Sequence, residues 1–486
     1  MKKLKDILFR VKIDSVYGDT DVNISHITFD SRKVKQDGLF IAISGYNLDG
    51  HDYIDQSLKN GAGVVVCEKL PENYKENKIV YVCVKCSKSA LGFIASNFYD
   101  NPSSKIDLVG VTGTNGKTTI SSLLNKLFND LKVKSGLIST INIRYNDFVE
   151  TSNNTTSDPI TMNYHLSEMI KNKLKVCFVE VSSHGIHQKR VSGLKFKGII
   201  FTNLTHDHLD YHKSFKDYRD TKKNVFDSLD KDSFALINID DKNANYMVQN
   251  TKASIYTYSL KSKSIFTCKI IEHQLDGMLL NIDNSEIWTK LIGQFNASNI
   301  LAIYSVGKLY KLDKIKLLTS ISKLDSVVGR LQSFLSSDKV TVIVDYAHTP
   351  DAIENVISTI NKVKKSNQNL ITIIGCGGDR DKDKRSMIGK ISSDLSSRVI
   401  FTSDNPRSED PKSIIENMVD GVSNFNKDKI IIEVEREKAI KHAKDNSSKG
   451  DIVLIAGKGH EDYQEFKNNK RIYFDDFKIA KEIFNN

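Results

Sequence analysis

A short glycine-rich segment carries the residue types and spacing needed to hold a phosphate chain. An apolar stretch at 106–111 leads into Thr112-Gly-Thr-Asn-Gly-Lys-Thr118, and a helix-like stretch follows at 120–131. Backbone N–H groups in such a turn form a concave anion site, and the helix N-terminus adds its positive end. Lys117 can reach the outer phosphates, and the Thr118 hydroxyl can ligate Mg²⁺. The segment therefore predicts a nucleoside triphosphate site.

This loop is tighter than the strict Walker pattern, because Val111 stands where that pattern has glycine. The order of glycine, lysine and hydroxyl between a strand and a helix is nevertheless typical of a phosphate loop. The predicted nucleotide contacts are Gly113, Thr114, Asn115, Gly116, Lys117, Thr118 and Thr119.

Candidate metal ligands lie in polar segments that follow two later apolar stretches. Glu180 is a lone carboxylate in the stretch 176–181. Because a buried charge is costly unless it is paired or bound to a metal, we predict a Mg²⁺ ligand here. The alternative is a carboxylate paired with an arginine.

The segment 203–212 offers a different metal chemistry. His206, His208 and Asp210 nearly match the HxHxDH zinc pattern of binuclear metallohydrolases, but Tyr211 stands where the last histidine is expected. This alternative predicts hydrolysis at a two-zinc centre and leaves the phosphate loop unexplained. A third interpretation is a surface loop that happens to be rich in histidine.

Apolar stretches alternate with helix-like stretches over most of the chain, which predicts an α/β fold with parallel sheets. In the last third, each predicted strand ends at a polar or glycine-rich segment, where ligands of doubly wound sheets bind. The section at 250–290 is less regular and predicts small antiparallel strands. A length of 486 residues suggests about three domains, which we place at 1–102, 103–330 and 331–486.

The composition limits the class of protein. Hydrophobic residues make up 39% and charged residues 27%, as in soluble globular proteins. The net charge is +10, but lysines are scattered among acids, which favours anionic small molecules over nucleic acid. The six cysteines are irregularly spaced and include one lone CxxC, which argues against a zinc site and fits reduced thiols in the cytoplasm. No stretch approaches the roughly 18 apolar residues of a membrane span.

Five motifs occur in order along the chain and at wide spacing. They are Thr112-Gly-Thr-Asn-Gly-Lys-Thr118, Glu180-Val-Ser-Ser-His184, Asn203-Leu-Thr-His-Asp-His-Leu-Asp210, Gly293-Gln-Phe-Asn-Ala-Ser-Asn299 and Asp345-Tyr-Ala-His-Thr-Pro350. Together they resemble the Mur ligases, ATP-dependent amide-forming enzymes of peptidoglycan precursor synthesis. The likeness extends from Asp30 to Glu461. It implies an N-terminal domain for a uridine nucleotide, a central ATPase with a P-loop-type parallel sheet, and a C-terminal Rossmann-like domain.

The resemblance also implies roles for residues that match the family's motifs. It implies catalytic roles for Lys117, Glu180, His208 and Lys222, and a Mg²⁺ site made by Thr118, Glu180, His208 and Lys222. Lys222 matches the family's carbamylated lysine, whose carbamate is an anionic oxygen ligand. Its spacing from Tyr218 favours it over Lys223, and the alternative is an ordinary lysine on a helix surface. On the ATP side the matching residues are Asn296, Asn299, Arg330 and Asp345.

For the other substrates, the resemblance implies two sets of contacts. The uridine nucleotide and the muramoyl-peptide would contact Ser31, Arg32, Thr155, Thr156, Ser182, Gln188 and Arg190. The incoming amino acid would contact Arg385, Asp404, Asn405, Arg407, Gly457 and Glu461.

Arg407 bears on the identity of that amino acid. Family members that add meso-diaminopimelate carry Asp-Asn-Pro-Arg, as in Asp404-Asn-Pro-Arg407, whereas lysine-adding members lack the arginine. A planar guanidinium can hold the distal carboxylate of meso-diaminopimelate and would repel the ammonium of lysine. The resemblance thus implies addition of meso-diaminopimelate to the D-Glu side-chain carboxylate of UDP-MurNAc-L-Ala-D-Glu through an acyl phosphate.

We expect a monomer that acts in the cytoplasm on small molecules. Three alternatives stay open at this point. One is a lysine-adding or other Mur-type ligase, such as the dipeptide-adding enzyme or folylpolyglutamate synthase. The second is the metallohydrolase described above. The third is an ATP-binding scaffold or switch without catalytic activity.

Overall fold

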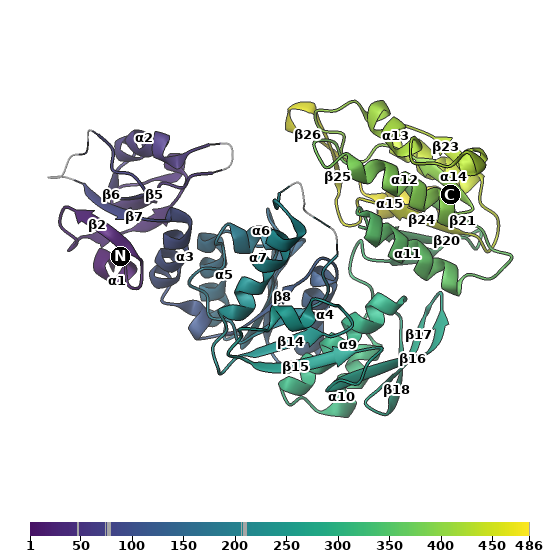
Figure 1. The fold of residues 1–486 in the computed structure, drawn as a ribbon, viewed down its shortest axis with the longest axis horizontal. Helices are drawn as coiled ribbons and strands as arrows, with labels where there is room; N and C mark the ends of the chain where they lie inside the picture. The colour runs from purple at the N-terminus through teal and green to yellow at the C-terminus, as the bar shows by residue number, and fades with distance from the viewer. Residues whose placement is uncertain (46–47, 73, 75–78, 206, 208–210, 486) are drawn as a thin grey trace.

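The computed structural model describes residues 1–45, 48–72, 74, 79–205, 207 and 211–485. Sheets of five, eleven and six strands organise the N-terminal, middle and C-terminal parts of the chain in turn (Figure 1). The predicted α/β class with largely parallel sheets is confirmed. The residue limits of the three domains stay a prediction.

The N-terminal part is built on the sheet β2-β7-β6-β5-β4, in which only the edge strand β2 is antiparallel to its neighbour. The inner strand β6 is buried along almost its whole length, so its sequence is a continuous apolar run without alternation. The elements of this part are β1 (Lys2–Lys3), α1 (Leu4–Ile7), β2 (Ile13–Tyr17), β3 (Asn23–Ile24), β4 (His26–Thr28), η1 (Ser31–Lys33), β5 (Gly38–Ile41), η2 (Gly50–Tyr53), α2 (Ile54–Lys59), β6 (Ala62–Cys67), β7 (Val80–Val84) and α3 (Ser87–Phe98).

The middle part is built on the sheet β11-β10-β9-β12-β8-β13-β14-β15-β16-β17-β18, which is parallel from β9 to β16 and antiparallel at both edges. Its elements are η3 (Pro102–Ser104), β8 (Asp107–Thr112), α4 (Lys117–Asp130), β9 (Ser135–Ile138), β10 (Asn142–Tyr145), β11 (Phe148–Thr151), α5 (Pro159–Lys171), β12 (Val176–Glu180), α6 (Ser183–His187), β13 (Gly198–Phe201), α7 (Phe215–Asp227), β14 (Phe234–Asn238), α8 (Ala244–Met247), β15 (Ser254–Ser259), β16 (Phe266–Gln274), β17 (Gly277–Ile282), β18 (Ser285–Thr289), α9 (Gln294–Leu309) and α10 (Lys314–Ser322).

The antiparallel prediction for 250–290 is confirmed for β16, β17 and β18, which form a meander at the sheet edge. It is wrong for β15, which pairs in parallel with β14 and so extends the main sheet by one strand. Ser254–Ser259 is partly exposed and of mixed polar composition. It therefore lacks the continuous apolar run by which a buried parallel strand is recognised in a sequence.

The C-terminal part is built on the sheet β19-β20-β24-β21-β22-β23, in which only β19 is antiparallel. Its last long strand, β24, lies between β20 and β21, and the hairpin β25–β26 follows it. The elements are β19 (Gln332–Leu335), β20 (Thr341–Asp345), α11 (Pro350–Val363), β21 (Leu370–Ile374), α12 (Asp383–Leu395), β22 (Arg398–Phe401), α13 (Pro411–Val419), η4 (Asn424–Lys429), β23 (Ile430–Ile432), α14 (Arg436–Asp445), β24 (Ile452–Ala456), β25 (Tyr463–Phe466), η5 (Lys467–Asn469), β26 (Lys470–Tyr473) and α15 (Asp476–Asn485).

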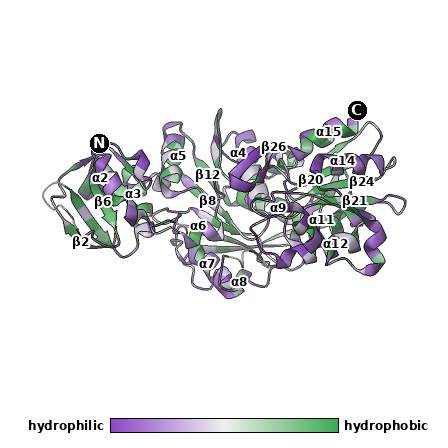
Figure 2. Cartoon of the chain, turned by 90° about the horizontal axis from the view of Figure 1, so that it is seen from above, coloured by the Kyte–Doolittle hydropathy of each residue, from purple (hydrophilic) through white to green (hydrophobic). Residues whose placement is uncertain are grey.

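Apolar side chains pack on both faces of the middle sheet. Val109 and Val111 of β8 belong to a cluster with residues of α4 and α9, whereas Leu108 belongs to a second cluster with residues of α5 and α7. Because successive side chains of a strand point to opposite faces, a strand between two helix layers must be apolar throughout. Figure 2 shows the strands largely in the hydrophobic colour and the covering helices in mixed colours. Within the described ranges, no helix has both the length and the apolar character needed to cross a membrane.

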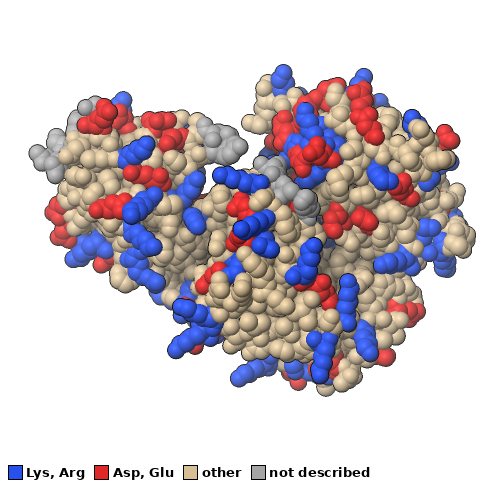
Figure 3. Space-filling view, viewed as in Figure 1, with Lys and Arg blue, Asp and Glu red and all other residues tan. Residues whose placement is uncertain are grey.

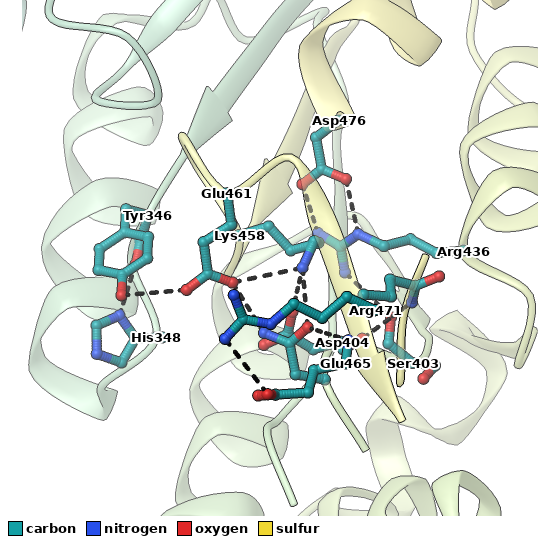
Figure 4. Close-up of polar contacts among 12 residues, drawn as sticks. Tyr346, His348, Ser403, Asp404, Arg436, Lys458, Glu461, Glu465, Arg471 and Asp476 are labelled. Carbon is teal, nitrogen blue, oxygen red and sulfur yellow. Dashed lines mark hydrogen bonds and ion pairs between the residues drawn. The ribbon is translucent and has the colours of Figure 1, made fainter. Parts of the chain in front are cut away.

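A buried ion pair fixes the last helix of the C-terminal part. Arg436, at the start of α14, donates to both carboxylate oxygens of Asp476 at 2.8 and 2.7 Å, and both side chains are fully buried. The same guanidinium donates to the Ala456 carbonyl at the end of β24, at 2.9 Å. The pair therefore joins α14, α15 and the central strand (Figure 4).

We expect Arg436→Met to lower the free energy of unfolding by about 3–5 kcal/mol, because it leaves the Asp476 charge buried without its partner. Urea unfolding followed by circular dichroism measures this change. Lys438→Ala, which removes an exposed ion pair with Glu435 on the same helix, should leave the urea midpoint unchanged. A stability of Arg436→Met equal to that of Lys438→Ala would contradict the structural role of the pair.

Candidate active site

Strand register brings three polar segments to one edge of the middle sheet. In the parallel pairing of β12 with β8, Glu180 lies opposite Val111, and in the pairing of β13 with β8, Phe201 lies opposite Thr112. The carboxyl ends of β8, β12 and β13 therefore meet side by side. The phosphate loop, Glu180 and the segment that begins at Asn203 lie at this edge, where ligands of parallel sheets bind.

The phosphate loop has the backbone that its glycines permit. Gly113 has φ +151° and Gly116 has φ +91°, both in the region that favours glycine. A Cβ atom at Gly113 would overlap the Thr202 hydroxyl, and one at Gly116 would lie 2.8 Å from the Asn299 side-chain oxygen. The loop is anchored to the segment after β13 by the Thr114 N–H, which donates to the Asn203 carbonyl at 2.9 Å.

Lys117 is the first residue of α4 and folds back over this loop. Its ammonium donates to the carbonyls of Gly113 and Thr114 at 2.9 and 2.8 Å. Burial lowers the pKa of Lys117, and the nearby carboxylates of Glu180 and Asp207 partly oppose that shift. An ammonium that donates to two backbone carbonyls can exchange them for phosphate oxygens.

Glu180 is fully buried, and its hydrogen-bond donors among the described residues are all neutral. It accepts hydrogen bonds from the Thr118 hydroxyl at 3.0 Å, from the Thr140 N–H at 2.8 Å and from the Thr140 hydroxyl at 3.0 Å. The alternative of an arginine partner is wrong for the described residues, since Arg330 donates instead to the Thr118 hydroxyl at 3.3 Å. A buried carboxylate beside a phosphate loop, with no ion-pair partner in the part of the chain that the structure describes, fits a Mg²⁺ ligand.

Lys222 lies on α7 and is buried, in contrast to an ordinary surface lysine. Its ammonium donates to the Gly113 carbonyl at 3.0 Å and lies 4.8 Å from the centre of the Tyr218 ring. Burial, and next the charge of Lys117, hold the pKa of Lys222 well below its ordinary value. The neighbouring Lys223 is different, because it pairs with Asp227 at 2.6 Å.

The remaining predicted metal ligand, His208, lies outside the described residues, as do His206 and Asp210 of the zinc alternative. In the ranges that the structure describes, no three His, Cys, Asp or Glu side chains gather where a metal ion could bind. Thr118, Glu180 and Lys222 are brought together around the phosphate loop. Of these three only Glu180 is a His, Cys, Asp or Glu residue, so the predicted site does not form such a cluster.

A cavity of about 500 Å³ lies between the middle and C-terminal parts, beside the phosphate loop. The predicted adenine-side residues Asn296 and Asn299 lie on α9, and the Asn299 amide donates to the Asn296 side-chain oxygen at 3.0 Å. From the C-terminal side come Arg330, whose guanidinium lies 4.6 Å from the centre of the Tyr346 ring, and Asp345. All four line this cavity together with residues 114–119.

Asp345 ends the strand β20 and is held by backbone. It accepts hydrogen bonds from the N–H groups of Leu331 and Ala347, each at 2.7 Å. Burial raises the pKa of Asp345, and the charge of Arg330 opposes this shift. The carboxylate thus fixes the chain segment that carries Arg330 toward the nucleotide cavity.

Two contacts join the C-terminal part to the middle part near the phosphate loop. The Asn115 amide donates to Asp351, in the first turn of α11, at 3.1 Å. Lys384 of α12 pairs with Asp207 at 3.1 Å. The two parts therefore meet over the site that the sequence predicts for ATP.

A second cavity, of about 850 Å³, opens between the same two parts. Figure 3 shows a hollow beside the C-terminal part, with basic and acidic side chains interspersed around it. The predicted residues that line the cavity are Lys117, Thr155, Ser182, Gln188, Arg190, Arg385, Asp404, Asn405, Arg407, Gly457 and Glu461. Residues predicted to contact the phosphates and residues predicted to contact the amino acid thus line the same cavity.

The muramoyl-peptide candidates form a connected group on the middle part. The Thr156 and Ser182 hydroxyls lie 3.0 Å apart, and Arg190 donates to the Thr156 carbonyl at 2.7 Å. Arg190 also donates to the Gln188 side-chain oxygen at 2.7 Å, and Thr155 accepts from the Thr140 hydroxyl at 3.1 Å. Thr140 therefore connects this group to Glu180.

The amino-acid candidates gather because β20, β24, β21 and β22 end at one edge. Asp345 lies opposite Ala456, and Ile374 lies opposite both Ala456 and Phe401, so the segments after these strands are neighbours. The buried Lys458 connects them: its ammonium lies 3.5 Å from Asp404, 3.1 Å from Asn405 and 3.4 Å from Glu461 (Figure 4). Glu461 also accepts from the Tyr346 hydroxyl at 3.4 Å.

The two arginines of this group are held differently. Arg385 is buried and donates to both oxygens of Glu409, at 2.8 and 2.9 Å, and to Asn417 at 3.0 Å. Its charge is therefore already paired within the protein. Arg407 is partly exposed and contacts Glu465 and the Gly378 carbonyl.

Ser31 and Arg32 line neither of the two cavities. They lie in η1 of the N-terminal part, where the Ser31 hydroxyl donates to Gln56 at 3.1 Å and Arg32 pairs with Asp30 at 2.9 Å. The Arg32 side chain is largely exposed. Their predicted contact with a uridine nucleotide stays a prediction.

Four residues of the site were missed by the sequence reasoning: Thr140, Glu409, Lys458 and Glu465. Lys458 lies inside Gly457-Lys-Gly-His-Glu461, so its motif was visible although its contacts were not. Thr140 lies two residues after the end of β9, and a polar residue just past the end of an apolar strand was a usable signal. No sequence pattern marks Glu409 and Glu465, because each pairs with an arginine far away in the sequence, Arg385 and Arg407 respectively.

The fold and the site define a P-loop α/β protein whose middle and C-terminal parts enclose a common cleft. Three family descriptions match the chain: "Mur ligase family, catalytic domain" over residues 23–99, "Mur ligase middle domain" over 111–307, and "Mur ligase, glutamate ligase domain" over 329–459. The chain belongs to the Mur ligase family.

Curated relatives match over nearly the whole chain. The UDP-N-acetylmuramoyl-L-alanyl-D-glutamate--2,6-diaminopimelate ligase of Cytophaga hutchinsonii is 48% identical over 481 residues, which cover 99% of each chain. The ligase of the same name from Bacteroides fragilis is 46% identical over 482 residues, again 99% of each chain.

Solved structures show the same architecture. A structure of a UDP-N-acetylmuramoyl-L-alanyl-D-glutamate--2,6-diaminopimelate ligase matches with a TM-score of 0.68 and 29% identity, covering 99% of this chain and 98% of that one. The MurF ligase from Thermotoga maritima in complex with ADP matches with a TM-score of 0.62 at 18% identity, covering 94% and 96%. The second likeness concerns the fold alone.

Proposed function

We propose that this chain is an ATP-dependent ligase that adds meso-diaminopimelate to the D-Glu side-chain carboxylate of UDP-MurNAc-L-Ala-D-Glu. The observation that carries the proposal is the single cavity lined by both Lys117 of the phosphate loop and Arg407 of Asp404-Asn-Pro-Arg407. A ligase needs its phosphate donor and its incoming amine in one enclosed space. The names of the relatives support the same substrates.

In the proposed reaction, the D-Glu carboxylate oxygen attacks the γ-phosphorus of ATP. A new P–O bond forms as the bond to ADP breaks, which gives an acyl phosphate. The amine of diaminopimelate then attacks the acyl carbon, loses a proton and displaces inorganic phosphate. Phosphoryl transfer depends chiefly on positioning and on neutralising charge, which explains a site made of lysines and arginines rather than a nucleophilic triad.

We assign roles to the chain's own residues from their positions. Lys117 and the N–H groups at the start of α4 hold the outer phosphates, and Arg330 approaches them from the C-terminal part. Thr118, Glu180, His208 and a carbamylated Lys222 would hold Mg²⁺, which when bound supplies positive charge beside the phosphates. Asn296, Asn299 and Asp345 shape the nucleoside end of the cavity.

The muramoyl-peptide, its uridine nucleotide and the incoming amino acid bind to the predicted residues that do not contact ATP. Thr155, Thr156, Ser182, Gln188 and Arg190 hold the muramoyl-peptide, and the N-terminal part holds the uridine nucleotide with Ser31 and Arg32. The amino acid binds at Asp404, Asn405, Arg407, Gly457 and Glu461, with Arg385 beneath them. Contacts such as that of Lys384 with Asp207 support closure of the two parts, which would shield the acyl phosphate from water.

We further propose that the enzyme works as a monomer in the cytoplasm. Both cavities form within one chain, between its own middle and C-terminal parts, so the proposed chemistry requires no second copy.

Release of phosphate from ATP tests the proposed function. With UDP-MurNAc-L-Ala-D-Glu present, we expect release that requires meso-diaminopimelate and is at least about tenfold slower with L-lysine, because lysine lacks the carboxylate that Arg407 would bind. Mass spectrometry of the UDP-linked product confirms the added residue. Equal or faster release with lysine would support the ligase activity but contradict the proposed specificity for meso-diaminopimelate. No release with either amino acid, from folded protein that binds ATP, would contradict the function.

A further inference from the structure

The hairpin β25–β26 is attached to the segment that contains Arg407. The Gln464 amide donates to the Asp404 carbonyl at 2.9 Å, and the Glu465 N–H donates to the Asn405 side-chain oxygen at 3.0 Å. The Arg407 N–H donates to the Glu465 carbonyl at 2.9 Å, and Arg407 forms a parallel bridge with Phe466. One strand thus fixes three of four successive positions, Asp404, Asn405 and Arg407, of the wall that faces the cavity.

The Arg407 guanidinium is held at two of its three nitrogens. Nε donates to Glu465 Oε2 at 3.0 Å, and Nη1 donates to the Gly378 carbonyl at 2.8 Å. A Cβ atom at Gly377 would lie only 3.0 Å from Nη1, so the side chain lies close against this glycine. Within the described part of the chain, Nη2 has no hydrogen-bond partner, and the residue lines the cavity.

Glu465 is suited to hold the guanidinium in place. Its side chain is 14% exposed, and its second oxygen, Oε1, accepts from Arg471 at 3.4 Å (Figure 4). The Arg471 guanidinium lies 4.2 Å from the centre of the Tyr463 ring on the adjacent strand of the hairpin. The backbone bonds of Glu465 to Asn405 and Arg407 hold this acceptor in place, and the long contact with the exposed Arg471 is peripheral to it.

We propose that Glu465 is a positioning residue that sets the acceptor specificity of the ligase through Arg407. This inference rests on the proposed function, because it needs a substrate with a second carboxylate. A free arginine side chain loses rotamer freedom when it binds, whereas a guanidinium fixed at Nε and Nη1 has lost it already. The plane of the fork is then set, and Nη2 is left to donate to the distal carboxylate of meso-diaminopimelate.

A double-mutant cycle of Arg407→Ala and Glu465→Gln tests the proposal by phosphate release. We expect Glu465→Gln to raise the KM for meso-diaminopimelate roughly tenfold, the loss of one charged hydrogen bond, while the KM for ATP changes less than about twofold. Arg407→Ala should raise the former KM further. In the Arg407→Ala background, Glu465→Gln should add nothing, because its effect passes through the guanidinium.

Arg471→Ala is the matched control, because it removes the other, exposed partner of the same carboxylate. We expect it to leave the KM for meso-diaminopimelate unchanged. If Glu465→Gln fails to fold, Glu465→Asp replaces it, since its shorter side chain cannot keep the 3.0 Å contact and should raise the same KM.

The outcomes separate the two proposals. Wild-type protein that does not require meso-diaminopimelate contradicts the proposed function before any variant is compared. With an active wild type, additive effects of the two substitutions, or equal rises in the KM for ATP and for diaminopimelate, overturn the role of Glu465.

Discussion

Lys117→Ala should lower kcat for phosphate release on the order of a thousandfold, because it removes the one ammonium that the phosphate loop places at the outer phosphates. The folded chain already holds this side chain on the loop, at 2.9 and 2.8 Å from two carbonyls. Binding of ATP exchanges these contacts for phosphate oxygens, so the loss should appear in turnover more than in the binding of the nucleoside. Steady-state phosphate release and calorimetric binding of ADP measure the two effects.

Stability is the control for this variant. Burial lowers the pKa of Lys117, which means that the fold does not favour its charged form. Removing the side chain should therefore leave the thermal midpoint at or above that of the wild type. Lys126→Ala, on the same helix but exposed and paired with Asp325, should change neither turnover nor the midpoint. Near-normal turnover of Lys117→Ala would contradict the assignment of the loop to ATP.

The phosphate loop shows what could be predicted from the sequence and why. Its strand, glycines, lysine and helix are contiguous, so local rules suffice to predict the anion site. In each parallel sheet the carboxyl ends of the strands lie at the edge where ligands bind. Glu180 ends a strand of the middle sheet and Asp345 ends a strand of the C-terminal sheet, so both could be predicted to lie near a ligand. The class of fold follows from the same alternation of buried strands with helices.

The partners of these residues could not be predicted in the same way. Glu465 lies 58 residues from Arg407, and Thr118 lies 62 residues from Glu180, so no spacing rule connects either pair. The pairs form because strands and hairpins bring distant segments together. Arg385 illustrates the consequence. Its motif predicts a contact with the substrate, and the structure shows in addition an ion pair with Glu409 that no motif predicts.

The N-terminal part marks the limit of the site predictions. Ser31 and Arg32 lie in a short 3-10 helix whose polar contacts are within its own part of the chain. A uridine-binding role therefore depends on family likeness rather than on a cavity that the structure shows. The middle and C-terminal parts differ, because there most of the predicted residues line common cavities, although Gly113, Thr156 and Lys222 line neither.

Lys222→Ala should lower kcat at least about a hundredfold, and a short carboxylate such as acetate or formate should restore part of the lost activity. The reason lies in the chemistry of the amine. Burial and the charge of Lys117 hold the pKa of Lys222 well below its ordinary value, so the fold favours the neutral amine over the ammonium. A neutral amine can attack the carbon of carbon dioxide: an N–C bond forms as one C=O π bond becomes a carboxylate oxygen, one proton is released, and the amine becomes an anionic carbamate.

Two observations would separate this carbamate from a purely structural lysine. In wild-type protein supplied with carbon-13 bicarbonate, a carbamate resonance should appear and should be absent from Lys222→Ala. Lys223→Ala is the matched control, since that neighbour is also buried but pairs with Asp227, and it should keep both the resonance and the activity. A folded Lys222→Ala that acetate and formate cannot rescue, together with no resonance in the wild type, would contradict the role. Lys222 lies 3.0 Å from the Gly113 carbonyl, so a carbamate on this side chain would place an oxygen ligand beside the phosphate loop.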